Sequence, residues 1–354
     1  MPAARPRFAG LRHGFFGLAH RERFAMPVQY SADRSDLFTP ARNATYFQHG
    51  QPRSDEALCA ELTRLAYFQV GANCAYDRRS VVFILSSVGF AECIFFERSP
   101  DTSVDPTYGG AHGFLAIDRK NRLAILCFRG ASLASRSDIW LGRNSALRHW
   151  DRGLGHVHSG FARALESVWP EVEAALEPVK DYKLLFTGHG LGAAIVTLAA
   201  SLWRPSALYT FGSPRIGDRE FVNTLNGVAN SRYVDCCDLI ARVSPTGSSG
   251  YEHIPGDIHY IDRRRIVRKL DPEDSFIRFD HVMAAVGYFL RHAWIPGNVL
   301  SRGLADHAPV NYVWPVTAAA PSCKGDPASL RSTGNPALNL STAPTEKARG
   351  LQAV

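Results

Sequence analysis

Apolar runs of strand length alternate with amphipathic stretches of helix length along most of the chain. From Ser54 onward, Leu58, Leu62 and Leu65 recur at the spacing of one helix face. Segment 122–129 is almost wholly apolar, as is typical of a strand that is covered on both faces. The pattern predicts further strands at 81–85, 92–97, 112–117, 207–211 and 232–235, and further helices at 161–176 and 279–292. Strands and helices that alternate through short linkers predict an α/β fold with a mostly parallel central sheet flanked by helices.

The clearest local pattern lies at residues 183–202. A short apolar run ends in Gly188-His-Gly-Leu-Gly192, and an Ala-rich amphipathic run follows. This order predicts a strand, a tight turn and a helix. In α/β-hydrolases such a turn carries the nucleophilic serine in the pattern G-x-S-x-G, because a sharp strand-to-helix turn projects the hydroxyl clear of the sheet. Here Gly190 occupies the place of that serine.

The composition changes near both ends of the chain. Residues 1–53 are rich in Arg, Gly, Pro and Ala, and we treat them as a basic N-terminal extension of unknown role. Residues 54–315 carry the α/β pattern and form the predicted domain. In residues 316–354 Ala, Pro, Ser, Thr, Gly and Asn dominate, and this composition predicts a disordered tail.

Charge and cysteine content narrow the classes of partner. The formal net charge is +7, and basic residues gather near the N-terminus and at 263–269. Without an interleaved aromatic motif these clusters predict a solvated surface, at most weakly attracted to anionic membranes, and no nucleic-acid partner. The seven cysteines include no pair with CxxC or Cys/His zinc spacing, so we predict core cysteines, no metal and no cofactor.

The N-terminal thirty residues contain arginines but no uninterrupted apolar core that ends in a small-residue cleavage site. The longest apolar stretches, 81–96 and 193–203, are too short or too interrupted to span a bilayer. These features predict a soluble protein in the cytoplasm. Export by a route that needs no such signal stays open.

Six blocks of sequence follow one another between residues 54 and 314. They are Cys127-Phe-Arg-Gly130, Val157-His-Ser-Gly-Phe161, the turn from Gly188 to Gly192, Tyr209-Thr-Phe-Gly-Ser-Pro214, Asp238 with Arg242-Val-Ser-Pro245, and Leu304-Ala-Asp-His307. Taken in this order, the blocks resemble the class 3 lipases, the fungal-lipase-like branch of the α/β-hydrolases. The resemblance implies an α/β-hydrolase fold, hydrolysis of ester or acylglycerol lipids, and no cofactor.

Ester hydrolysis by such an enzyme needs a nucleophile, a histidine base and a carboxylate that fixes the histidine tautomer, in the chain order Ser, Asp, His. The resemblance places the carboxylate at Asp238, with Asp235 as the fallback. Two histidines, His281 and His307, follow an aspartate directly. His281 sits in a helical run and His307 in a Gly- and Pro-containing loop, so we prefer His307 and keep His281 as the alternative.

The resemblance also assigns the oxyanion hole to the backbone N–H groups of Ala131 and Leu191. Family members usually carry Thr or Ser where this chain has Ala131, so the backbone donor is kept and a supporting hydroxyl is lost. A lid over the site would fall at residues 132–147.

Gly190 has no side chain that can attack a carbonyl, and no G-x-S-x-G occurs elsewhere in the chain. Together with Ala131 it predicts a lipase-like protein whose hydrolase activity is lost or strongly impaired, a lipid-binding pseudoenzyme. One alternative is an active esterase in which a water activated by His307 and Asp238, or another serine such as Ser132, attacks. Two others remain: serine stands at 190 in the natural chain, or the protein binds membrane surfaces without any link to lipid cleavage.

Overall fold

The computed structural model describes residues 30–40, 45–47, 54–70, 75–98, 111–130, 146–242, 250–256 and 258–319. All of these residues belong to one compact unit. Most of the predicted N-terminal extension, and the predicted tail beyond residue 319, lie outside the described residues.

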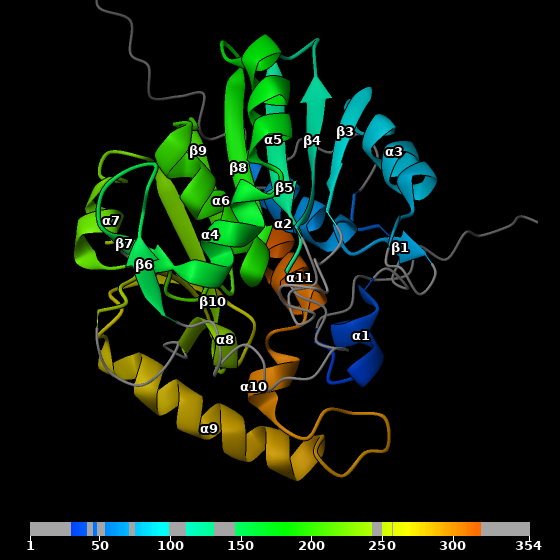
Figure 1. Cartoon of the computed structure of the whole chain (residues 1–354). Helices are drawn as coiled ribbons and strands as arrows, with labels where there is room; N and C mark the ends of the chain where they lie inside the picture. Colours follow the sequence, from blue (N-terminus) through cyan, green and yellow to red (C-terminus); the bar gives the residue numbers. More distant parts are fainter. Residues whose placement is uncertain are drawn as a thin grey trace, which may run out of the picture. The chain divides into compact units, whose positions relative to one another are not determined.

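The centre of the fold is an eight-stranded sheet with the order β12-β11-β10-β9-β8-β5-β4-β3 (Figure 1). Strands β5, β8, β9, β10 and β11 are parallel to one another, and antiparallel pairs occupy the two edges. The predicted mostly parallel sheet is therefore confirmed. The strands are β3 (Glu92–Glu97), β4 (His112–Asp118), β5 (Leu123–Phe128), β8 (Lys183–His189), β9 (Ala207–Phe211), β10 (Asn230–Asp235), β11 (Ile258–Ile261) and β12 (Val267–Leu270).

Helices cover both faces of this sheet. On β5, Leu126 and Phe128 join one core with helices α4, α5 and α6, while Ile125 and Cys127 join a second core with α2 and α11 (Figure 1). β5 is thus buried on both faces, as its apolar sequence predicts. The helices are α1 (Arg34–Phe38), α2 (Asp55–Leu65), α3 (Arg78–Ser86), α4 (Ser159–Glu166), α5 (Trp169–Leu176), α6 (Leu191–Leu202), α7 (Arg219–Asn223), α8 (Leu239–Arg242), α9 (Ser275–Arg291), α10 (Arg302–Ala305) and α11 (Pro309–Ala319).

Two short antiparallel pairs lie outside the main sheet. One joins β1 (Gln69–Val70) to β2 (Ala75–Tyr76), and the other joins β6 (Leu147–His149) to β7 (His156–His158). A 3₁₀ turn, Glu177–Val179, follows α5.

The predicted strand at 81–85 is wrong, because these residues lie in α3. Asp77 caps the helix by accepting a hydrogen bond from the backbone N–H of Ser80, and Val81 and Leu85, one helical turn apart, are both buried. A short apolar run fits a strand and a helix equally well, and here the capping aspartate decides.

The single helix predicted at 161–176 is two helices, α4 and α5. Pro170 stands in the first turn of α5, where its missing N–H costs nothing, whereas the same ring inside one continuous helix would clash with the preceding turn.

Part of the predicted extension packs into the domain. The backbone N–H of Ser31 donates to Oδ1 of Asn311 at 2.8 Å, and the backbone N–H of Arg34 donates to the carbonyl of Gly297 at 2.9 Å. Leu37 packs in a cluster with Tyr288 and other buried residues of the C-terminal region. At the other end, α11 continues to Ala319, past the predicted start of the tail. The domain borders themselves stay predictions.

His158 caps α4 from the end of β7. Its Nδ1 accepts from the backbone N–H of Gly160 at 3.1 Å, and its ring stacks on Phe161 with the centroids 3.9 Å apart. Burial, helped by the positive charge of Arg163, lowers the pKa of His158 to about 4. The folded protein therefore holds this imidazole neutral at a pH where the unfolded chain would protonate it.

This depressed pKa predicts that stability falls in acid. The unfolded histidine, with a pKa of about 6.5, takes up a proton before the folded one does, so the contribution of His158 is complete above pH 6.5 and is lost as the pH falls toward 4. We expect this residue to account for at most about 3 kcal/mol of the decrease. Urea unfolding at pH 7, 5.5 and 4.5 tests this against His158→Asn, which keeps a capping side chain and does not titrate. An equally steep decrease in the variant contradicts the assignment.

Candidate active site

The turn between β8 and α6 holds Gly190 in a backbone conformation that L-residues rarely adopt, with φ +54° and ψ −118°. Its backbone N–H donates to the carbonyl of Phe211 on the neighbouring strand at 2.9 Å, which fixes the turn at the carboxyl end of the sheet. The predicted strand, turn and helix are confirmed.

Asp238 follows β10 and is fully buried. Its carboxylate accepts hydrogen bonds from the backbone N–H of Ile240 at 2.8 Å, from Nδ1 of His307 at 2.9 and 3.1 Å, and from the hydroxyl of Tyr312. Burial raises the pKa of Tyr312 well above its usual value, and the nearby Asp238 raises it further. The phenol therefore stays protonated and donates. Asp238 is held rigidly enough to orient an imidazole.

His307 stands between α10 and α11 and faces Gly190. An ionised carboxylate can only accept, so the bond to Asp238 places the proton of His307 on Nδ1 and leaves Nε2 as an acceptor. A Cβ atom on Gly190 would lie 3.1 Å from Nε2. The position where a nucleophile would be attached thus lies directly against the free nitrogen of an Asp-oriented histidine.

Gly212, at the end of β9, keeps this arrangement open. Its φ is +59°, and a Cβ there would lie 2.5 Å from Asp238 Oδ2 and 3.1 Å from His307 Nδ1. Any side chain at this position would displace the Asp238–His307 pair. No local sequence pattern indicates this requirement, because the contact joins three separate segments of the chain.

His189 forms the buried wall behind His307. The two ring centroids are 4.5 Å apart, and Nδ1 of His189 lies 2.7 Å from the hydroxyl of Tyr67. Burial, helped by the proximity of His307, lowers the pKa of His189 well below its usual value. His189 is therefore a neutral packing partner and does not compete with His307 for a proton.

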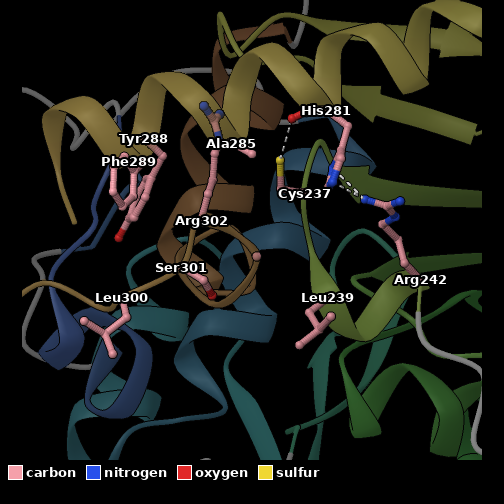
Figure 2. A pocket seen from close by; sticks show the side chains of 11 residues that line it. Cys237, Leu239, Arg242, His281, Ala285, Tyr288, Phe289, Leu300, Ser301 and Arg302 are labelled. Carbon is pink, nitrogen blue, oxygen red and sulfur yellow. Dashed lines mark hydrogen bonds between the residues drawn. The ribbon is translucent and has the colours of Figure 1, made fainter.

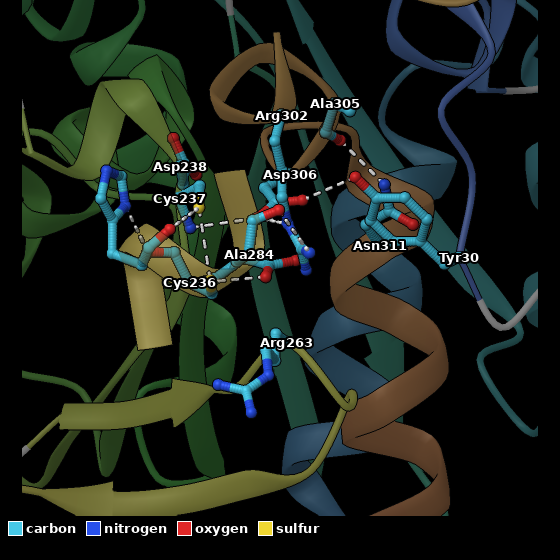
Figure 3. A network of polar contacts seen from close by, with 12 residues as sticks. Tyr30, Cys236, Cys237, Asp238, Arg263, Ala284, Arg302, Ala305, Asp306 and Asn311 are labelled. Carbon is cyan, nitrogen blue, oxygen red and sulfur yellow. Dashed lines mark hydrogen bonds and ion pairs between the residues drawn. The ribbon is translucent and has the colours of Figure 1, made fainter. Parts of the chain in front are cut away.

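A buried network around Asp306 fixes the two segments that carry Asp238 and His307 (Figure 3). The Asp306 carboxylate accepts from the backbone N–H of Cys237 at 3.0 Å, from Tyr30 at 2.9 Å and from Arg302 at 3.1 Å. Cys237 directly precedes Asp238, and Asp306 directly precedes His307. One carboxylate thus ties together the neighbours of both side chains.

The structure separates the two histidine candidates. His281 lies on α9 in a cavity of about 570 Å³, where both of its ring nitrogens are within 2.9 Å of the Arg242 guanidinium (Figure 2). Of these two described histidines, His307 is hydrogen-bonded to Asp238 and His281 is not. The arrangement favours His307 over His281 as the partner of Asp238.

Asp235, the fallback carboxylate, has a different partner. It is fully buried and binds the Arg265 guanidinium at 2.7 and 2.9 Å. Burial raises the pKa of the Asp235 carboxyl well above its usual range, and the charge of Arg265 opposes that rise. Asp235 therefore joins β10 to the β11–β12 hairpin and does not reach His307.

Of the two proposed oxyanion donors, Leu191 and Ala131, the structure describes only Leu191. Leu191 is the first residue of α6, and the N–H groups in the first turn of a helix have no partner within that helix. Its donor is thus available beside Gly190. Ala131 lies outside the described residues, as does most of the predicted lid at 132–147.

Among the described residues, Cys236, Cys237 and Asp306 form one group whose donor atoms lie within 4.8 Å of one another. The Asp306 carboxylate already accepts from three donors of the chain, including the Arg302 guanidinium. This group therefore belongs to the network in Figure 3, and we assign no metal to it.

Residues 126–248 match the family model of the class 3 lipases. This segment, about a third of the chain, contains the Phe-Arg-Gly block, Gly190 and Asp238 but ends before His307. The chain is lipase-like over this segment, and its fold is that of an α/β-hydrolase.

Curated relatives agree with the family match. A secreted mono- and diacylglycerol lipase of Fusarium solani is 34% identical over 163 residues, which is 43% of this chain and 48% of that protein. A secreted mono- and diacylglycerol lipase of Penicillium cyclopium is 31% identical over 42% of this chain and 52% of that protein. The chain spans about half the length of these curated relatives.

Solved lipase structures are similar in outline. The Lip2 lipase of Yarrowia lipolytica gives a TM-score of 0.49 at 18% identity and covers 64% of this chain and 87% of that one. The triacylglyceride lipase of Rhizomucor miehei gives 0.47 at 22% identity and covers 72% and 100%.

The predicted cytoplasmic location is wrong. The relatives from Fusarium and Penicillium are secreted lipases, which contradicts that prediction. Among the described residues, none of the helices has the length and apolar character needed to cross a membrane.

The pair Asp235–Arg265 predicts a large effect on stability. In Asp235→Asn the always-charged guanidinium of Arg265 would stay buried without the carboxyl group that it binds, so we expect the free energy of unfolding to fall by about 3–5 kcal/mol. The matched control is Glu92→Gln, which removes one partner of the exposed pair with Arg119 and should cost at most about 1 kcal/mol. Urea unfolding at neutral pH measures both. Equal losses in the two variants would show that the buried pair has no special role.

Proposed function

We propose that the protein is a class 3 lipase-like α/β-hydrolase that binds ester or acylglycerol lipids and has lost most or all of its hydrolytic activity. One observation carries the proposal: Gly190 leaves no nucleophile on a backbone position whose Cβ would lie 3.1 Å from Nε2 of His307, which Asp238 orients. The hydrogen bond between Asp238 and His307 is in place, and only a nucleophilic side chain at position 190 is missing. Lipid binding is favoured by the similarity to mono- and diacylglycerol lipases.

The roles follow from this geometry. Asp238 would fix the tautomer of His307 and stabilise its charged form, and His307 would accept a proton at Nε2. The N–H of Leu191, with that of Ala131, would bind a carbonyl oxygen at the start of α6. Without a serine these groups polarise and hold an ester carbonyl but form no acyl-enzyme.

Restoring the hydroxyl tests the proposal directly. We expect Gly190→Ser to hydrolyse short-chain p-nitrophenyl esters at least about 10²-fold faster than the natural chain, because a triad supplies several orders of magnitude over binding and oxyanion stabilisation alone. The strained backbone at Gly190 should cost the variant about 1–3 kcal/mol of stability.

Two controls isolate the chemistry. Gly190→Ala adds the same Cβ and the same strain without a hydroxyl, and it should stay at background. Gly190→Ser combined with His307→Ala should also return to background. Hydrolysis by the Gly190 chain as fast as that of an active serine variant would refute the loss of activity.

A second candidate is a hydrolase that uses water, and the intact Asp238–His307 hydrogen bond specifically favours it. In this case the natural chain cleaves esters, loses the activity in His307→Ala, and is insensitive to organophosphate reagents. Stable labelling of a serine would exclude the water route and indicate another nucleophile such as Ser132.

A further inference from the structure

Helix α9 turns an apolar face to solvent. Every exposed side chain between Phe279 and Leu290 is apolar, although the opposite side of the helix packs on the domain through Ala284 and Tyr288. Figure 1 shows the helix along one edge of the molecule, and its Ala284 packs against residues of β10 and β11. The large side chains of this surface, which we name the α9 face, are Phe279, Val282, Met283, Val286, Phe289 and Leu290.

The same surface continues beyond the end of the helix. Trp294 is 73% exposed and Leu300 is 82% exposed, and Leu300 and Phe289 also line the cavity in Figure 2. Proteins that remain monomeric in water rarely expose so many large apolar side chains together, and such surfaces mark docking sites for proteins or membranes. An exposed tryptophan next to such a face is typical of a lipid–water interface.

The charges around the α9 face are positive. Arg278 and Arg291 stand at its two ends, and Arg264 lies beside it, all three exposed and without an ion-pair partner among the described residues. Between Phe279 and Arg291 the single acid is Asp280, which is buried and paired with Arg263. Further acids gather only before the helix, at 271–274.

A hollow on one flank joins apolar and basic groups. It has a volume of about 510 Å³, and its lining includes Met283, Val286 and Leu290 together with Arg264 and Arg291. An anionic head group beside an acyl chain presents this combination of chemistries.

Charge also argues against a second copy of the chain as the occupant. A symmetric antiparallel pairing centred between Met283 and Val286 would set Arg278 of one copy beside Arg291 of the other. Like charges at an interface repel, whereas an anionic lipid layer neutralises them.

We infer that the α9 face docks the protein onto an anionic lipid surface. The helix would lie in the plane of the interface with its apolar side chains among the upper acyl groups and its arginines at the level of the head groups. This deepens the proposed lipid binding by naming the surface that receives the lipid layer, and it does not depend on ester cleavage.

The first test is sedimentation of the full chain with phosphatidylcholine vesicles, with and without phosphatidylglycerol. We expect stronger binding to the anionic vesicles, and about tenfold weaker binding for V282Q/V286Q/L290Q. The matched control is V82Q/F83Q/L154Q, which removes three exposed apolar side chains elsewhere and should bind as the natural chain does. Circular dichroism and thermal unfolding confirm that each variant is folded.

The second test addresses the arginines. R264Q/R291Q should lose about fivefold of its affinity for phosphatidylglycerol vesicles per arginine at low salt, and little for neutral vesicles. Trp294 emission should shift to shorter wavelength on binding, and Trp294→Phe should bind without that shift.

Three outcomes would overturn the inference: no binding to anionic vesicles, equal binding by the α9-face variant and the control, or a lipid-free dimer in light scattering that V282Q/V286Q/L290Q dissociates. Because vesicle binding is measured without ester cleavage, each of these leaves the result for Gly190→Ser unaffected.

Discussion

The buried carboxylate of Asp238 is the constraint on which the candidate site depends. A carboxylate without water must be satisfied by hydrogen bonds, and this one accepts from the backbone at the start of α8, from His307 and from Tyr312. These donors come from segments about seventy residues apart. Satisfying one charge therefore sets the positions of β10, α8 and α11 relative to one another, and with them the direction in which His307 points.

Asp306, which directly precedes His307, is a second buried carboxylate that fixes separate segments of the chain. Its bonds to Cys237, Tyr30 and Arg302 hold the neighbours of Asp238 and His307 together and attach the N-terminal segment to the C-terminal helices. The Asp238–His307 pair is thus part of the buried hydrogen-bond network at this end of the domain. Stability alone would preserve such a pair even without a catalytic role, which accounts for an intact Asp238–His307 bond facing Gly190.

The exposed apolar side chains of α9 contrast with the buried Asp238–His307 pair. A helix with one apolar side normally turns that side to the core. Helix α9 packs one side on the domain but also leaves a second, apolar side, the α9 face, in water. Both this face and the candidate site adjoin the cavity lined by Cys237, Leu239 and Phe289. A lipid layer on the α9 face would therefore lie beside the segment that carries Asp238.

The sequence by itself determined the parallel sheet and the strand–turn–helix at Gly190, because periodicity and glycine spacing are local signals. The family blocks made Asp238 and His307 the preferred candidates. The sequence failed at 81–85, where an apolar run fits two structures, and it left Asp235 and His281 open. Only the tertiary structure paired Asp235 with Arg265 and His307 with Asp238, and only it showed which side of α9 meets solvent. Those outcomes depend on contacts between residues far apart in the chain, and the local spacing of residues does not predict such contacts.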